Sequence, residues 1–331
     1  MGSLRSALGV AALASALAVP ARAFTRSTAG PGGPCLFWAQ PGHSFVIDAS
    51  ATPDVPPASA FDAVRRSFAT WAGVQCAHLT FPDQGLSTDP ANRKIGYVPG
   101  GNNINLVLWR TANCSSGAVP AGDPCLTEGN CGNKYDCWDH GDSVIAVTTT
   151  TFNRSTGQIF DADIELNDSN PSGGSHFIFT TADCPAGSST CLCSGAQTDA
   201  CAHYDVQNTV THEAGHSIGL DHTTVQDATM YAFAPEGEES KRALHQDDID
   251  GVCAIYPDGE PTTCDGGAVV LVDAGPVDAG GPAASSGGGC ASAPGTPGSS
   301  DGALVAVALG CGALLARRRR RRHPLGGVPP G

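Results

Sequence analysis

The chain has 331 residues, and its 32 acidic against 18 basic side chains give a formal net charge of −14 at pH 7. Such an acidic balance favours solubility and cationic substrates. No nucleic-acid-binding module is recognisable, and no internal repeat indicates a second folded domain. The roughly 235 residues of 24–258 are enough to bury one sizeable core, so we expect a single folded domain there.

The N-terminus has the pattern of a secretory signal. Arg5 precedes an apolar stretch over residues 7–19, and the small-x-small sequence Ala21-Arg22-Ala23 follows it. We therefore expect residues 1–23 to be removed, the mature chain to begin near Phe24, and the protein to leave the cytoplasm.

The chain then alternates between predicted helices and strands. Apolar residues at helical spacing after Pro56-Pro57 predict a helix with one face in the core: Phe61, Val64, Phe68 and Trp71. β-Branched or alternating runs predict strands over residues 44–48, 104–109, 144–151 and 159–166. A further helix is predicted over residues 206–220. This order favours an α/β fold, a mixed sheet with helices packed on it.

Cysteine usage supports an oxidising compartment. Of fourteen cysteines, Cys290 and Cys311 lie in the tail, and the other twelve form an even number. Two groups fall in Gly/Ser/Asn-rich loops: Cys114, Cys125, Cys131 and Cys137, and Cys184, Cys191, Cys193 and Cys201. The alternative is a structural zinc, but the spacings are irregular, so we predict disulfides that staple long insertions.

The run from His212 to His222 carries the strongest chemical signal. On a helix, His212 and His216 lie four apart and present two imidazoles to one point. Gly219 follows, where a left-handed residue ends the helix and returns the chain, so that His222 is the third zinc ligand. Glu213 is left as the general base for a zinc-held water. Three protein ligands predict a catalytic zinc and a hydrolase.

The alternative is that HExxH arises by chance and that its histidines cap or pack an ordinary helix. Gly219 and His222 argue against this alternative, because five fixed positions must agree and two of them follow the helix.

Met230, the internal methionine, lies eight residues after His222. His212 to His222, followed by Ala228-Thr229-Met230-Tyr231, resembles the zinc site and Met-turn of the metzincin metalloproteases, and most closely the matrixin branch. Residues 63–71 and 79–81 resemble the matrixin first helix and the strand after it, residues 159–167 the edge strand beside the substrate cleft, and residues 246–256 the closing helix.

The resemblance covers residues 44–257 and implies a zincin-like catalytic domain. Its expected parts are a twisted mixed sheet, an active-site helix and a smaller lower subdomain, with a cleft between the upper and lower parts. It also implies a peptide bound in extended form along residues 159–167, and Met230 below the zinc. Ordinary core packing is the other explanation for Met230.

The chain departs from the matrixin pattern in several places. No cysteine-switch motif is present, and we interpret Cys35 as half of a disulfide. Ala232, Phe233 and Ala234 replace the usual proline and tyrosine of the specificity-pocket wall. His43, His78, His140, His176 and His203 do not reproduce the structural-zinc spacing and are assigned no metal. Calcium is a candidate ion here, with Asp161, Asp163 and Asp168 as its ligands, although an acidic strand end is more often solvated.

The C-terminal part has a different composition. Residues 259–300 are rich in Gly, Ala, Pro and Ser, which predicts a disordered linker. The short apolar run 302–316, followed by arginines 317–322, predicts a short transmembrane segment within residues 301–331. The arginines could instead bind nucleic acid, but their position after an apolar run favours an anchor. With Cys290 as the processing site, this order resembles the MYXO-CTERM sorting tail, which implies a sorting protease as partner.

These features together predict an exported zinc endopeptidase that cleaves proteins or peptides. The membrane would hold it before processing, and it would then reside at the cell surface, on the outer membrane, or be secreted. Two alternatives stay open. One is a catalytically silent surface binding or adhesion module, against which the intact Glu213 argues. The other is a maturation protease dedicated to one partner.

Overall fold

The computed structural model describes residues 23–101, 103–169, 176–183, 201–272, 283–285 and 307–312. The predicted signal segment up to residue 22, Cys184, Cys191, Cys193, Cys290 and the arginines 317–322 lie outside these residues. The prediction that 1–23 is a signal therefore stays a prediction.

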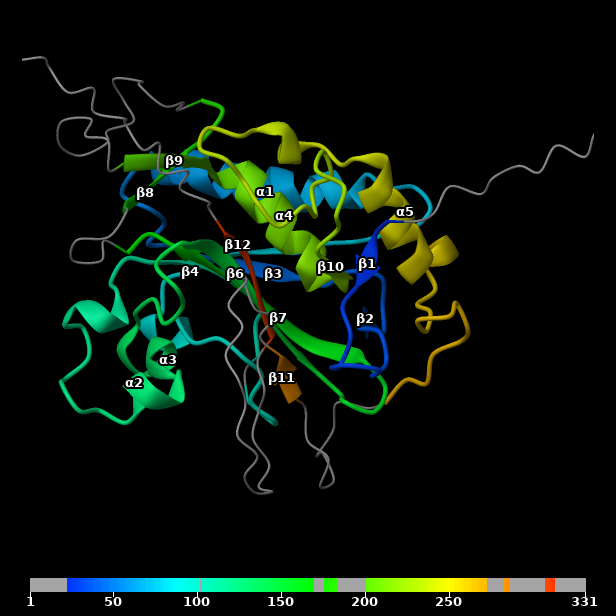
Figure 1. Cartoon of the computed structure of the whole chain (residues 1–331), viewed down its shortest axis with the longest axis horizontal. Helices are drawn as coiled ribbons and strands as arrows, with labels where there is room; N and C mark the ends of the chain where they lie inside the picture. Colours follow the sequence, from blue (N-terminus) through cyan, green and yellow to red (C-terminus); the bar gives the residue numbers. More distant parts are fainter. Residues whose placement is uncertain are drawn as a thin grey trace, which may run out of the picture.

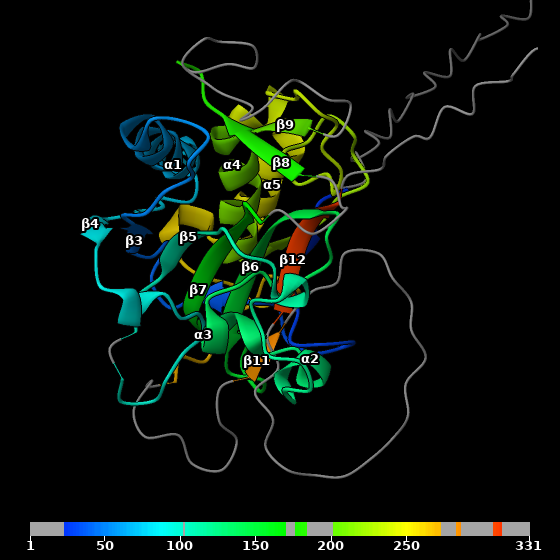
Figure 2. The same ribbon diagram turned by 90° about the vertical axis from the view of Figure 1, so that its left-hand side faces the viewer.

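A twisted mixed sheet forms the centre of the molecule, as predicted (Figures 1 and 2). Four strands pair in parallel in the order β4 (Asp83–Ser87), β3 (Phe45–Asp48), β5 (Leu106–Arg110) and β7 (Gln158–Asn167). Strand β6 (Val144–Phe152) then pairs with β7 in the antiparallel direction. The predicted strand over residues 79–81 is only a bridge between Gly42 and Thr80, and the strand itself begins at Asp83.

Two helices cover one face of this sheet, α1 (Pro57–Ala72) and α4 (Val206–Ser217) (Figure 2). Helix α1 begins with a proline in its first turn, as the sequence predicts, and buries Phe61, Val64, Phe68 and Trp71. Phe68 stacks on Phe45 of β3 with ring centroids 4.1 Å apart. The apolar stripe of α1 therefore joins the sheet to α4.

Shorter elements complete the fold. Strand β1 (Thr25–Arg26) pairs with β10 (Leu220–Asp221), β2 (Phe37–Trp38) pairs with β7, and β8 (His176–Thr180) pairs with β9 (Cys201–Asp205). Helix α5 (Gln246–Ile255) closes the domain as predicted. Helices α2 (Cys125–Glu128) and α3 (Cys131–Tyr135) lie away from α1 (Figure 1). Single 3-10 turns occur at Pro90–Asn92, Cys114–Ser116, Ser240–Arg242 and Pro257–Gly259.

The expected cleft-edge strand is wrong. Strand β7, which contains residues 159–167, lies between β5 and β6 and is buried on both faces. Its acidic residues, for which solvation was the alternative to calcium binding, are buried. For example, Glu165 Oε1 accepts a hydrogen bond from Arg110 Nε at 2.6 Å, and both side chains are buried. Strand β6 lies on the outer side of β7, and beyond it, among the described residues, only the C-terminal strands β11 (Ala283–Ser285) and β12 (Val307–Gly312) pair with the sheet on that side.

Four disulfides are present among the described residues. Cys114 bonds to Cys137 and Cys125 to Cys131, which confirms that the first cysteine group staples the insertion with α2 and α3. Cys76 joins Cys253. Cys35 bonds to Cys264, which confirms its interpretation as half of a disulfide.

Cys264 of the Cys35–Cys264 bond lies beyond residue 258, where the sequence predicts that the folded domain ends. The sequence predicts a disordered linker from residue 259, but the ordered chain continues through residue 272. Besides the Cys35–Cys264 bond, Arg26 donates hydrogen bonds to the carbonyls of Thr262 and Thr263, both at 2.7 Å. Val272 exchanges two hydrogen bonds with Gln158. Covalent and polar anchors thus order a segment whose composition lacks large apolar residues.

The tail contributes two strands to the sheet. Strand β11 (Ala283–Ser285) and strand β12 (Val307–Gly312) both pair with β6 in the antiparallel direction. The described part of the predicted apolar segment 302–316 is therefore a strand. Across the described residues, no helix is long and apolar enough to cross a membrane.

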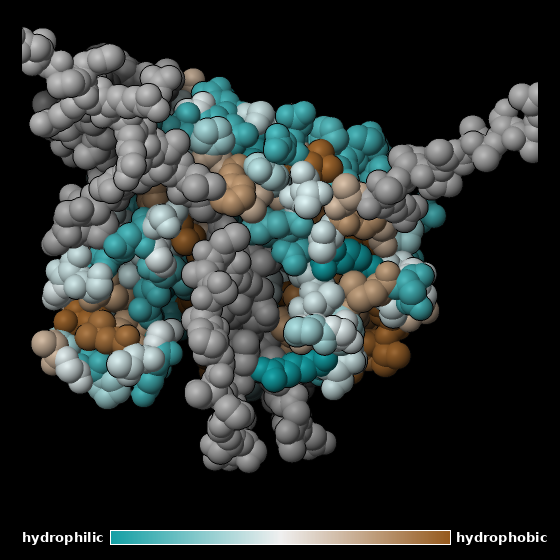
Figure 3. Space-filling model, in the orientation of Figure 1, coloured by the Kyte–Doolittle hydropathy of each residue, from teal (hydrophilic) through white to brown (hydrophobic). Residues whose placement is uncertain are grey.

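The visible surface is mostly polar, with separate apolar patches (Figure 3). One patch lies over the region of α2 and α3, and another lies on the opposite side of the same face. Large apolar side chains with substantial exposure among the described residues are Leu86, Val98, Leu126, Val270 and Leu271.

The Cys35–Cys264 bond generates a stability prediction. A protein that ends at residue 258 should have a free energy of unfolding about 2–5 kcal/mol lower than one that ends at residue 272, because the long covalent loop is lost. It should therefore unfold at a lower urea concentration. Replacement of Cys35 by Ser in the protein that ends at residue 272 should produce most of the same loss of unfolding free energy. Equal stability of the three proteins in urea would place the domain end at residue 258 after all.

Candidate metal centre

Helix α4 is held at both ends. At its start, Asp205 accepts a hydrogen bond from Asn208 N at 2.7 Å, and Arg242 pairs with the same carboxylate at 2.6 Å. The helix ends at Ser217, and Gly219 follows with φ of +101°. A side chain at Gly219 would also collide with the carbonyl of Leu36. Only glycine allows the chain to turn back here without strain.

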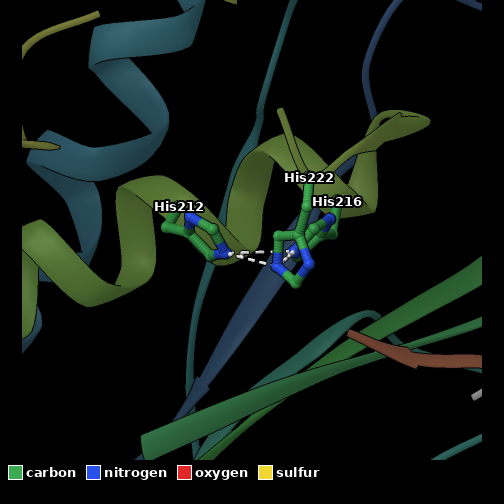
Figure 4. Close-up of side chains that lie close together, drawn as sticks. All are labelled: His212, His216 and His222. Atoms are coloured by element: carbon green, nitrogen blue, oxygen red, sulfur yellow. Dashed lines mark hydrogen bonds between the residues drawn. The ribbon is translucent and has the colours of Figure 1, made fainter. Parts of the chain in front are cut away.

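The turn brings His222 to the two histidines of the helix (Figure 4). The three Nε2 atoms lie 3.1 Å apart for His212 and His216, and 3.2 Å from each of these to His222. Within the described residues, these three form the one group of three or more His, Cys, Asp or Glu side chains close enough to share a metal ion.

The other ring nitrogens decide what the Nε2 atoms can do. His212 Nδ1 lies 2.6 Å from the carbonyl oxygen of Thr229, and His216 Nδ1 lies 2.9 Å from that of Leu220. A carbonyl only accepts, so each Nδ1 carries the proton and donates it. Burial lowers the pKa of His212 and His216 well below the ordinary imidazole value, and it also lowers the pKa of His222. The rings of His212 and His216 are therefore neutral, and their Nε2 atoms present lone pairs.

Lone pairs that meet in a buried space repel one another unless a cation lies between them. Zinc bonds to imidazole at about 2.0–2.1 Å, which places nitrogen ligands of a tetrahedral ion roughly 3.3 Å apart. The spacing of 3.1–3.2 Å between these Nε2 atoms fits that geometry. The carbonyl contacts orient two of the rings in the way that outer hydrogen bonds orient metal-bound histidines.

Glu213 is fully buried next to His212 and faces strand β6. Its Oε2 accepts a hydrogen bond from the hydroxyl of Thr148 at 2.7 Å. The same hydroxyl lies 3.0 Å from the main-chain oxygen of Glu213. Sequence reasoning did not identify Thr148. The signal for it was a run of four threonines within an otherwise apolar strand.

Met230 packs directly beneath the helix. It is buried, and a Cβ on Gly215 would collide with its sulfur and with Trp71. Asp248 of α5 holds this turn, because its carboxylate accepts hydrogen bonds from Thr229 N at 2.8 Å and Met230 N at 2.9 Å. Gly215 and Asp248 were also missed by sequence reasoning, although Gly215 lies inside the histidine motif.

The segment after Met230 is tied to a buried lysine. Lys241 Nζ donates to the carbonyls of Tyr231 at 2.6 Å and Phe233 at 2.9 Å, and its side chain is 1% exposed. The chain that carries Ala232 and Ala234 is thereby fixed in place.

The three candidate calcium ligands do not gather into one group. Asp163 accepts hydrogen bonds from the main-chain N of Gly96 and Leu106, and it interacts with Asp161. Burial raises the pKa of Asp161 to about 6. Asp168 instead lies near Asp54, and burial followed by the charge of Asp54 raises the pKa of Asp168 to about 8. Calcium therefore stays a prediction.

Three of the histidines that were assigned no metal have hydrogen-bond or ion-pair partners. His43 is buried with Nε2 2.9 Å from Ser217 Oγ, and burial lowers its pKa to about 4. His140 pairs with Glu165 and His203 with Glu236.

Asp168 generates a prediction on pH. Its folded-state pKa, about 8, exceeds the value of 3.8 for an ordinary Asp, so the folded form retains the proton longer than the unfolded chain does. The free energy of unfolding should therefore fall as pH rises from about 4 to about 8, by at most about 1.4 kcal/mol per pH unit from this group. Asp168→Asn should flatten that slope, as measured by urea unfolding across the range.

The control for this prediction is calcium itself. If added calcium stabilises the natural protein at pH 6 and leaves Asp168→Asn unchanged, the carboxylate is ionised and binds the cation well below a pKa of about 8, which contradicts the protonated form.

Comparisons with known proteins agree with this site. Residues 126–257 match the matrixin family model, Peptidase_M10. Neutrophil collagenase of Homo sapiens is 44% identical over 59 residues, 18% of this chain and 13% of that protein. Metalloendoproteinase 5-MMP of Arabidopsis thaliana is 40% identical over 63 residues, 19% of this chain and 17% of that protein. Matrilysin of Homo sapiens is 41% identical over 46 residues, 14% of this chain and 17% of that protein.

The chain thus spans less than a fifth of the length of each of these curated relatives. The family match includes helix α4, the three histidines and Met230, and it extends through α5. This match and the mixed α/β fold are consistent with a matrixin-like catalytic domain over this part of the chain.

Proposed function

We propose that this protein is an exported, zinc-dependent endopeptidase. The observation that carries the proposal is the convergence of three imidazoles, two of them fully buried, whose Nε2 atoms lie 3.1–3.2 Å apart, with the carboxylate of Glu213 on the helix that carries His212 and His216. The match of residues 126–257 to the matrixins supports it. His212, His216 and His222 would hold the zinc.

A zinc ion at these three imidazoles supplies Lewis acidity, which polarises a scissile carbonyl and acidifies a water. The protein residues do the rest. Glu213 accepts the proton of the attacking water and later delivers it to the leaving amine. Its burial excludes bulk water from competing for that proton. Met230 and Gly215 pack α4 against the turn, so the two helical histidines keep their orientation.

Strand β6 is the edge best suited to an extended peptide substrate. It becomes the outer strand of the sheet when the C-terminal strands β11 and β12 are removed, and its residue Thr148 contacts Glu213. A peptide that pairs with β6 gains main-chain hydrogen bonds and passes beside the candidate base. This strand replaces residues 159–167 as the expected substrate strand.

In the full chain, β12 occupies the same edge, and its Leu309 lies opposite Thr148. A protein that ends at residue 272 should therefore hydrolyse peptides faster than the chain with its tail, because β12 no longer competes for β6. We expect a difference on the order of 10-fold, since a tethered segment acts at a high effective concentration. Equal rates on a quenched peptide substrate would show that β12 does not compete with substrate.

Removal of the tail fits the proposed route of the protein. The signal at residues 1–23, the Cys290 motif and the arginines 317–322 support export, then anchoring before a sorting protease acts near Cys290. The mature enzyme would then reach the cell surface or be secreted.

The central experiment compares zinc content and peptide hydrolysis in the protein and in its Glu213→Ala variant. We expect about one zinc per chain in both proteins, and hydrolysis that a chelator abolishes. Loss of the base should lower kcat by at least about 100-fold without loss of zinc. A quenched peptide library read by mass spectrometry gives the cleavage preference.

Other outcomes identify the alternatives. Bound zinc without hydrolysis of any peptide would favour the surface binding module. Cleavage of one partner protein but of no unrelated denatured protein would identify a dedicated maturation protease. Full activity in Glu213→Ala would refute the assigned base.

A further inference from the structure

Strand β6 places one hydroxyl against the carboxylate of Glu213. Thr148 Oγ1 lies 2.7 Å from Glu213 Oε2 and 3.0 Å from the main-chain oxygen of Glu213. Both residues are completely buried. The contact joins two elements far apart in sequence, and it lies one residue from the first histidine of the metal centre.

The hydroxyl has a single proton to donate. Its two nearby acceptors are a carboxylate and an amide carbonyl, and the carboxylate is both closer and charged. A hydrogen bond to a charged acceptor is stronger than one to a neutral carbonyl, so the proton goes to Oε2. This bond restrains rotation of the carboxylate about its last side-chain torsion, which is otherwise broad.

The neighbouring residues of β6 provide a control for the Thr148 hydroxyl. Ile145, Ala146 and Val147 before it are buried apolar residues. Thr150, two positions along and on the same face, is also buried, yet its hydroxyl has no hydrogen-bond partner among the described residues. Thr150 is therefore a matched control for the loss of a buried threonine hydroxyl.

We propose that Thr148 is a positioning residue that holds the Glu213 carboxylate in the orientation needed for proton transfer. This inference rests on the proposed peptidase function, in which Glu213 is the base. The hydrogen bonds of the Thr148 hydroxyl in the described structure go to Glu213 and to none of the three histidines, so Thr148 acts through Glu213. It would therefore affect the proton-transfer steps and leave metal binding unchanged.

The first test is steady-state kinetics of the zinc-loaded protein beginning at Phe24, with Thr148→Val, Thr148→Ser and Thr150→Val. We expect Thr148→Val to lower kcat about 10- to 100-fold, with KM within about twofold, because a misplaced catalytic group loses rate and not ground-state binding. Thr148→Ser should restore most of kcat. Thr150→Val should keep the natural kcat, because its hydroxyl does not contact Glu213, and any effect should fall on KM, since Thr150 lies in the proposed substrate strand. Zinc content and thermal midpoint are measured for each variant.

The second test does not need turnover. In protein labelled with carbon-13 glutamate, infrared spectra should show a shift of one carboxylate band in Thr148→Val. The shift should be absent when Thr148→Val is made in a Glu213→Gln background, which assigns the band to Glu213.

Each outcome bears on one claim. Normal kcat in Thr148→Val, or equal losses in Thr148→Val and Thr150→Val, would overturn the positioning role while leaving the peptidase intact. An unshifted carboxylate band would overturn the contact itself. A natural protein that binds zinc but hydrolyses nothing would overturn the proposed function, and the positioning role with it.

Discussion

The convergence of three imidazole Nε2 atoms at one point is the constraint on which the rest of this structure depends. His212 and His216 donate their Nδ1 protons to carbonyl oxygens, so their Nε2 atoms carry no proton and cannot hydrogen-bond to each other. The two lone pairs of His212 and His216 repel each other, and a cation between the three Nε2 atoms would turn this arrangement into a three-ligand site. The carbonyl groups of Thr229 and Leu220 restrain the rotation of the His212 and His216 rings.

Much of the hydrophobic core serves this purpose. Trp71 of α1 donates a hydrogen bond from its indole N–H to the carbonyl of Thr211 at 2.8 Å, directly before His212. Met230 packs where Gly215 leaves no side chain, and Asp248 secures the turn around Met230 from a third helix. Because protein interiors are close-packed, displacement of any of these groups is transmitted to the imidazoles.

The periphery is held by different forces. The insertion with α2 and α3 is stapled by two disulfides, and the buried Arg110 connects it to the sheet by pairing with both Asp136 and Glu165. The Cys35–Cys264 bond ties the segment after α5 to the start of the domain. Such covalent and ionic anchors order chain segments that have too little apolar surface to fold by burial alone.

The amino-acid sequence by itself determined the local features: the amphipathic helix α1, helix α4, the strands of the sheet, and the spacing of His212, His216 and His222. These follow from the periodicity of neighbouring residues, which the chain carries wherever it folds. Only the tertiary structure decided which strand is outermost, because pairing order depends on contacts between distant segments. It also decided that Thr148 meets Glu213, that Cys35 bonds Cys264, and that Asp168 lies near Asp54 and apart from Asp161 and Asp163. No local pattern encodes these contacts, since each joins residues whose proximity is set by the packing of the whole domain.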